Sequence, residues 1–241
     1  MRIALFVTCV NDAVYTGTAK AVVSLLERLG HQVVFPADQT CCGQMHLNSG
    51  YRPEALHLAR RFVKVFSAYD VVVSLSASCA GTVVESYAHL AEDAGDQALT
   101  DAVGDLAPRV HELSQLLVDV LGVTDVGASF AHRVAYHPTC HSLRVLHLAD
   151  QPLQLLRNVK GLQLVDLPDA STCCGFGGTF AMKNADTSVA MMSDKLAAVH
   201  ASGAEVLCAL DNSCLAHIGG GASRLASGLR TMHLAEILAG G

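Results

Sequence analysis

The sequence predicts an α/β protein made of two tandemly repeated, Rossmann-like units with parallel sheets. Short apolar or β-branched runs alternate with longer segments of helical periodicity along all 241 residues. Nine cysteines are present, and the spacing of four recurs in four others after 131 to 135 residues. Hydrophobic residues make up 51% of the chain and charged residues 16%, so apolar material is ample for folded cores and a disordered chain is excluded.

The first predicted unit spans residues 1–122. Three of its apolar runs are short enough to be buried parallel strands: residues 3–7, 33–35 and 71–75. Apolar residues at helical spacing predict helices over 21–29 and 55–66. A strand followed by a short amphipathic helix over 111–121 completes the unit.

The second predicted unit spans residues 131–241 and repeats this order. Its strands are expected at three short runs: residues 134–136, 162–165 and 205–210. The clearest helical pattern has one apolar face: Ala185, Val189, Met192, Leu196 and Val199. A short amphipathic helix over 233–238 ends the unit, as in the first half.

Each unit carries four cysteines in the same order, and three strands precede them. The corresponding positions are Cys9 and Cys140, Cys41-Cys42-Gly43 and Cys173-Cys174-Gly175, and Cys79 and Cys214. Because the carboxyl ends of parallel strands meet at one edge of a sheet, we expect the four thiols of each unit to converge there. The ninth cysteine, Cys208, lies within a predicted strand and is expected to be a buried apolar residue.

The cysteine pattern indicates a metal site rather than a set of disulfides. The apolar start of the chain is too short for a signal peptide, so we expect a cytoplasmic protein with reduced thiols. Four thiolates suit zinc or an iron–sulfur cluster. The two Cys-x2-4-Cys pairs typical of structural zinc are absent from the sequence, and neighbouring cysteines can reach different irons of one cluster. The spacing therefore favours iron–sulfur and leaves zinc as the alternative.

Four segments resemble the cysteine-rich CCG domain family: Thr40-Cys41-Cys42-Gly43-Gln44, Tyr136 to His141, Cys173 to Phe180 and Asp211 to Cys214. The resemblance covers the whole chain. Similar domains occur in the small iron–sulfur subunit of bacterial L-lactate utilisation complexes, in the glycolate oxidase iron–sulfur subunit and in heterodisulfide reductase.

The resemblance implies up to two iron–sulfur clusters, with the repeated cysteines as their ligands. By resemblance, one cluster of the 4Fe-4S type would be held by Cys9, Cys41, Cys42 and Cys79, and another by Cys140, Cys173, Cys174 and Cys214. The implied role is an electron-transfer subunit of an oxidoreductase complex that oxidises L-lactate or a related 2-hydroxy acid such as glycolate. Its implied partners are the other subunits of that complex.

The chain departs from the fullest form of the family motif, which ends in Cys-x-x-Cys. Ser76 and Asp211 stand at the penultimate positions, so each unit keeps four cysteines instead of five. A four-thiolate cluster, or zinc in a scaffold subunit without redox activity of its own, is easier to accept than a five-thiolate cluster. A thiol-redox enzyme using the vicinal cysteines is a third interpretation, but it leaves Cys9 and Cys79 without a role.

Two histidines beside Cys140 break the repeat. His137 and His141 correspond to Phe6 and Val10 of the first unit, so a ligand role common to both units is not expected for them. We expect them to donate hydrogen bonds near the second cluster, to contact a partner, or to bind zinc if the second site holds zinc.

Glycines after the vicinal cysteines predict close approach of the backbone to the bound group. Gly43 and Gly175 allow a turn that other residues avoid, while Gly177 and Gly178 extend the second loop. Lys183 follows this loop and is a candidate to offset the negative charge of the thiolates.

Several functions are excluded. The net charge of −6 without a block of like charges argues against nucleic acid as a partner. No apolar run reaches the roughly 18 to 20 residues of a membrane span, so no transmembrane segment is expected. The glycine-rich fingerprints of dinucleotide and nucleotide sites are also absent from the sequence. We therefore expect hydride chemistry to reside on a partner.

Overall fold

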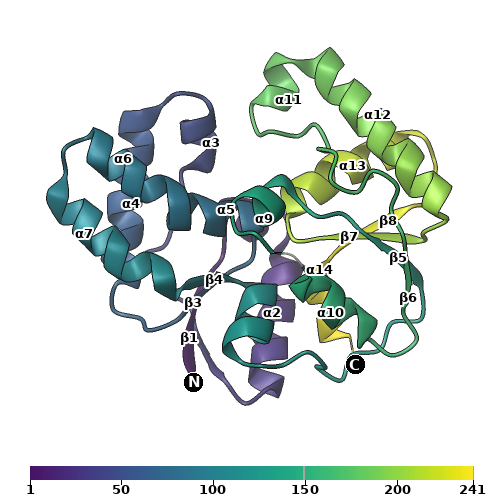
Figure 1. The fold of residues 1–241 in the computed structure, drawn as a ribbon, viewed down its shortest axis with the longest axis horizontal. Helices are drawn as coiled ribbons and strands as arrows, with labels where there is room; N and C mark the ends of the chain where they lie inside the picture. Colours follow the sequence, from purple (N-terminus) through teal and green to yellow (C-terminus); the bar gives the residue numbers. More distant parts are fainter. Residues whose placement is uncertain (149, 241) are drawn as a thin grey trace.

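The computed structural model describes residues 1–148 and 150–240 and contains two parallel sheets of four strands each (Figure 1). The first half has strand order β2-β1-β3-β4: β1 (Arg2–Phe6), β2 (Gln32–Val34), β3 (Val72–Ser74) and β4 (Val110–Glu112). The second half has order β6-β5-β7-β8: β5 (Arg133–Tyr136), β6 (Gln163–Val165), β7 (Val206–Ala209) and β8 (Arg230–His233). The two orders are the same, and the predicted α/β class with parallel, Rossmann-like units is confirmed.

Helices connect the strands in both halves. Those of the first half are α1 (Cys9–Ala13), α2 (Thr16–Arg28), α3 (Gln44–Asn48), α4 (Arg52–Phe66), α5 (Ala77–Gly81), η1 (Thr82–Ser86), α6 (Tyr87–Asp93), α7 (Gln97–Leu106), η2 (Ala107–Arg109), α8 (Leu113–Gln115) and η3 (Leu116–Val120). Those of the second half are α9 (Cys140–Arg144), α10 (Gln151–Arg157), α11 (Phe180–Lys183), α12 (Ala185–Ser202), α13 (Asn212–Arg224) and α14 (Leu234–Ala239). The first half thus adds α6 and α7 between its third and fourth strands, where the second half has α13 alone among the described residues.

The last helix of each half begins later than the periodicity predicts. The side chain of Glu112 accepts the backbone N–H of Ser114 at 2.8 Å, and helix formation begins directly after it. Nδ1 of His233 accepts the N–H of Ala235 at 3.1 Å in the same way. The predicted starts at residues 111 and 233 are therefore wrong, because residue 111 belongs to a strand and residue 233 caps the helix.

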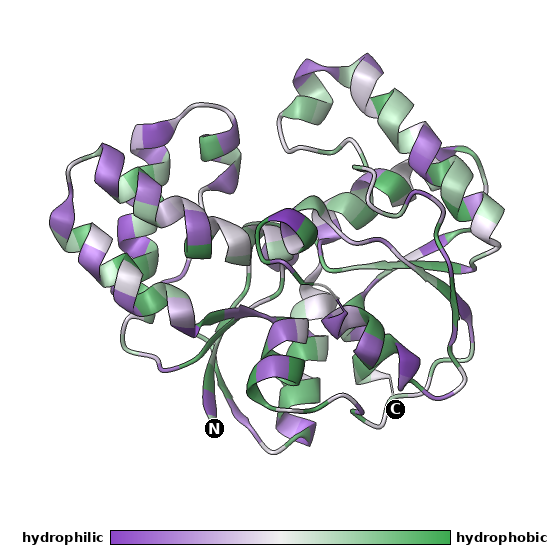
Figure 2. Ribbon diagram, viewed as in Figure 1, coloured by the Kyte–Doolittle hydropathy of each residue, from purple (hydrophilic) through white to green (hydrophobic). Residues whose placement is uncertain are grey.

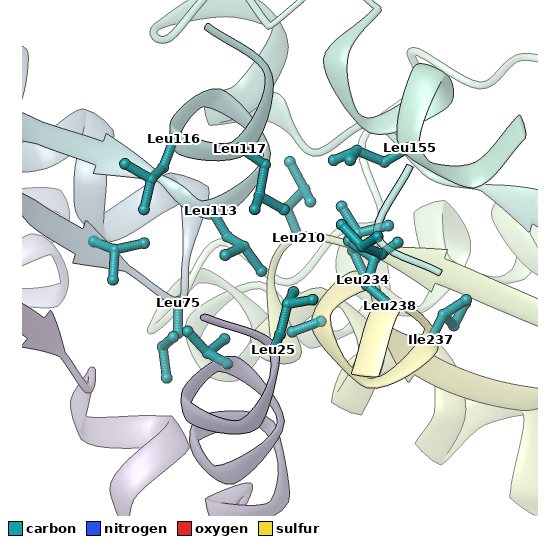
Figure 3. Packing of buried hydrophobic residues seen from close by; sticks show 14 of the residues in the cluster. Leu25, Leu75, Leu113, Leu116, Leu117, Leu155, Leu210, Leu234, Ile237 and Leu238 are labelled. Carbon is teal, nitrogen blue, oxygen red and sulfur yellow. The ribbon is translucent and has the colours of Figure 1, made fainter. Parts of the chain in front are cut away.

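The two halves share one hydrophobic core. Leu25 of α2, Leu117 of η3, Leu155 of α10 and Leu238 of α14 meet between the sheets (Figure 3). Helix α2 packs against α14, so an element of the first half is held by the last element of the second. Burial of apolar surface from both halves therefore fixes their relative placement.

Hydrophobic positions follow the strands and the inner sides of the helices, while hydrophilic residues mark the outer turns of α4, α6 and α7 (Figure 2). Each sheet has a second apolar cluster on the face away from the shared core. In the first half this cluster includes Phe6, Phe62 and Phe66, and in the second half it includes Leu196 and Val199. Among the described residues, no helix combines the length and apolar character that a membrane crossing requires.

Candidate metal centre

Four cysteines of the first half, here called the first nest, meet at the carboxyl ends of the strands: Cys9, Cys41, Cys42 and Cys79. Cys9 begins α1 directly after β1, the vicinal pair follows β2 and precedes α3, and Cys79 lies in α5 after β3. The sulfur of Cys9 lies 3.6 Å from that of Cys41, and the sulfur of Cys42 lies 3.1 Å from that of Cys79. Thiols from three separate loops are therefore in mutual contact.

The second nest consists of Cys140, Cys173, Cys174 and Cys214, carried by equivalent loops. Cys140 begins α9 after β5, the pair follows β6, and Cys214 lies in the first turn of α13 after β7. The thiol of Cys140 is hydrogen-bonded to Cys173. The sulfur atoms of Cys174 and Cys214 lie within 4.8 Å of each other and of a ring nitrogen of His137. All eight of these cysteines, and Cys208 inside β7, are free thiols.

Both nests line a single cavity of about 210 Å³ between the two halves. Two polar contacts join the halves beside it. The Gln44 side-chain amide donates to Nε2 of His141 at 2.9 Å, and the hydroxyls of Ser49 and Thr179 share a hydrogen bond of 2.8 Å. The repeat predicts two equivalent sites but contains no information on their relative placement, so this shared cavity is a finding of the structure.

The glycine after each vicinal pair shapes its nest. Gly43 and Gly175 have φ values of +84° and +87°, in the left-handed region that favours glycine. The N–H of Gly43 donates to the sulfur of Cys41 at 3.3 Å, and that of Gly175 to the sulfur of Cys173 at 3.4 Å. A Cβ on Gly175 would also lie 2.6 Å from the carbonyl oxygen of Ser188. A side chain at this position would therefore displace the turn that presents the second pair.

Hydrogen bonds among the thiols make their ionisation interdependent. A bond from Cys42 lowers the pKa of Cys41, and a bond from Cys140 lowers the pKa of Cys173. The donors resist ionisation in turn, since these bonds raise the pKa of Cys42 and of Cys140. Each nest can therefore ionise further only when a cation takes the place of thiol protons, which is the behaviour of a metal-binding thiol set.

His137 distinguishes the second nest. Its side chain is 1% exposed, and neither ring nitrogen has a hydrogen-bond partner among the described residues. Burial, followed by the charge of Lys195, lowers its pKa to about 4, so the imidazole is neutral at pH 7. A neutral ring near two sulfur atoms has one N–H to donate and one lone pair for a metal. His141 lines the cavity but pairs with Gln44 of the first half.

The buried cation of the second nest is Lys195, not the predicted Lys183. Lys183 is exposed at the end of α11, whereas Lys195 of α12 is 1% exposed and its Nζ donates to the carbonyl oxygens of Asp169 and Ala170 at 2.8 and 3.1 Å. The inward face of α12 also differs from the predicted one, since Val189 is 51% exposed. A lysine directly before Leu196 on this face was the available signal for the buried cation.

The residues that replace a fifth cysteine in each half contact one another. The hydroxyl of Ser76 donates to Oδ1 of Asp211, and so does the hydroxyl of Ser78 at 2.7 Å. Asp211 is 2% exposed, and its Oδ2 has no hydrogen-bond partner in the described part of the chain. These three residues line the cavity, so a polar bridge between the halves lies beside both nests. Gly177 and Gly178 line it as well, with φ values of +53° and +64°.

Comparison with known proteins agrees with this geometry. The cysteine-rich domain called CCG matches twice, over residues 3–84 and 134–219. "Lactate utilization protein A" of Geobacillus kaustophilus (strain HTA426) is 47% identical over 99% of this chain and 98% of its own length. Proteins of the same name from Oceanobacillus iheyensis and Bacillus subtilis (strain 168) are 45% and 44% identical, each over 99% of this chain and over 96% and 99% of their own lengths.

Solved structures match only distantly. An aspartate racemase homologue from Pyrococcus horikoshii OT3 aligns with 99% of this chain and 95% of its own chain, at 10% identity and a TM-score of 0.36. A glutamate racemase from Bacillus anthracis has the same TM-score at 11% identity, over 99% of this chain and 78% of its own. Likeness at this level carries no argument about function.

Proposed function

The chain belongs to the cysteine-rich CCG domain family, and from this premise we propose that it is an iron–sulfur electron-transfer subunit of a cytoplasmic system that oxidises L-lactate. The observation that carries the proposal is the convergence of four thiols from each half on one cavity. Relatives named for lactate utilisation that match over nearly their whole length support the choice of L-lactate over glycolate.

The donor set fits an iron–sulfur cluster in each proposed unit, residues 1–122 and 131–241. The four sulfur atoms of a nest come from separate loops, as a multi-iron group requires, and backbone N–H groups of Gly43 and Gly175 already point at sulfur. A bound cluster of the 4Fe-4S type would supply a one-electron donor and acceptor. The chain would hold it through its thiolates and shield it by burial of Cys42 and Cys174, each 2% exposed.

The cavity is poorly suited to the hydroxy acid itself. Within the described part of the chain, its lining contains no lysine or arginine to pair with a carboxylate. Its thiols and the carboxylate of Asp211 would repel an anion. We therefore assign oxidation of the substrate to partner subunits of the system and assign electron transfer to this chain.

Iron and sulfide analysis of anaerobically purified protein tests the proposal. We expect roughly stoichiometric iron and sulfide together with broad visible absorption that bleaches on reduction. The variant Cys208→Ala is a matched control, because Cys208 is buried inside β7 away from the cavity lining and its loss should leave the iron content unchanged. Colourless protein after anaerobic reconstitution would contradict the proposal.

A zinc-stabilised scaffold subunit without redox activity is the second candidate. The group formed by His137, Cys174 and Cys214, with ligand atoms within 4.8 Å of one another, favours it. This candidate requires zinc in purified protein, and chelation should lower the melting temperature without any redox signal. The variant His137→Ala should then weaken zinc binding in the second nest and leave the first nest unaffected.

A further inference from the structure

The first nest lies against an aromatic wall. Phe6 at the end of β1 packs edge-on against Phe62 of α4, with ring centroids 4.9 Å apart. Phe62 also contacts Tyr87, whose hydroxyl donates to the carbonyl oxygen of Cys42 at 2.8 Å. Cys42 and Cys79 belong to the same buried cluster as these rings. The surroundings of the first nest on this side are therefore apolar and uncharged.

Polar and charged residues occupy the corresponding positions behind the second nest. His137 follows β5 in the place where Phe6 ends β1. The inward-facing residues of the two long helices match one for one at a separation of 133 residues: Ala55, Ala59, Phe62, Val63 and Phe66 of α4 with Ser188, Met192, Lys195, Leu196 and Val199 of α12. Lys195 and His137 thus replace the packed pair Phe62 and Phe6.

Lys195 acts on the second nest at close quarters. Its Nζ donates to the carbonyl oxygens of Asp169 and Ala170, on the loop that leads into Cys173. The thiols of Cys173 and Cys174 lie within its electrostatic reach. Because Lys195 is 1% exposed, solvent screens its charge far less than it screens an exposed lysine.

We infer that Lys195, assisted by His137, makes the second nest the electron-accepting end of the pair, where the reduced and more negative state of the bound group is the more stable. The inference rests on the proposed function for the nature of that group. Reduction adds one negative charge to a group that four thiolates already make anionic. A buried ammonium lowers the free energy of that state, and an aromatic wall does not.

Redox titration of protein with one nest at a time tests the inference. The variant Cys41→Ser/Cys42→Ser leaves the second nest, and Cys173→Ser/Cys174→Ser leaves the first. We expect the second nest to have the higher midpoint potential. Adding Lys195→Met should make its reduction about tenfold less favourable, a fall of about 59 mV, while Lys195→Arg should preserve the potential. Lys183→Met removes an exposed lysine of α11 and is the matched control without effect.

Cobalt(II) binding provides a second readout that does not require iron. Binding of this ion by four thiolates also creates an anionic complex, so Lys195→Met should weaken cobalt binding by the second nest about tenfold and leave the first nest unchanged. Thermal unfolding of each variant verifies that it is folded. Equal effects on both nests, or no effect on either, would overturn the inference, whereas failure to bind iron with the cobalt difference intact would overturn only the proposed function.

Discussion

The two halves of the molecule share a framework and differ in what surrounds their thiols. Their sheets have the same strand order, and each presents four cysteines from equivalent loops. Phe6 and Phe62 back the first nest, while His137 and Lys195 back the second. A duplicated framework can therefore keep the same ligands while the electrostatic environment of each site diverges.

Removal of one vicinal pair at a time is the strongest way to break the comparison. We expect Cys41→Ser/Cys42→Ser to lose about half of the bound iron and sulfide, and Cys173→Ser/Cys174→Ser to lose the other half, because each nest has its own set of four thiols. Elemental analysis of anaerobic samples measures both. Complete loss from either variant would mean that the nests hold one shared group across the cavity.

Truncation of Phe62 tests whether the first half depends on its aromatic wall. Phe62 is 4% exposed and packs against three other rings, so Phe62→Ala should lower the free energy of unfolding by about 3 to 5 kcal/mol. Phe35, which is 54% exposed, is the matched control, and Phe35→Ala should change it by less than about 0.5 kcal/mol. Urea denaturation measures both variants, and equal losses would refute a special role for the wall.

The residues that end the fourth strand of each half predict opposite dependences on pH. Burial raises the pKa of Glu112 from 4.5 to about 7, so the folded state keeps a proton that the unfolded state loses first. Stability from this group is present below pH 4.5 and is lost as the pH rises to about 7. Burial lowers the pKa of His233 below 6.5, so its contribution is present above pH 6.5 and is lost as the pH falls.

Unfolding measured across this pH range sharpens the contrast. Relative to the unchanged protein, Glu112→Gln should gain stability between pH 4.5 and about 7, by at most about 3 kcal/mol. His233→Gln should gain relative stability only as the pH falls below 6.5. Differences that stay constant with pH for both variants would show that neither group titrates in the way its burial requires.

Several parts of the molecule could be predicted from the sequence because they depend on local pattern. Strand and helix periodicity identified the α/β class, and the order of Cys9, the vicinal pair and Cys79 placed thiols after successive parallel strands. The helix over 111–121 was predicted to start too early, because periodicity does not register that Glu112 caps the following turn.

Lys195 shows the limit of pattern within a single helix. Its face of α12 was predicted one residue away from the true one, because Val189 fits the apolar period but is exposed. A lysine is ordinarily assigned to solvent, and only the carbonyl oxygens of Asp169 and Ala170 at the end of its side chain explain its burial.

The sequence alone determined the class of fold and which thiols follow which strands, since backbone geometry and the direction of parallel strands require nothing beyond nearby residues. Tertiary structure alone decided that the two nests open into one cavity and that Ser76 meets Asp211 across it. These features depend on how the shared core orients one half against the other. That orientation results from packing between residues such as Leu25 and Leu238, which are far apart in the chain and have no signature in local periodicity.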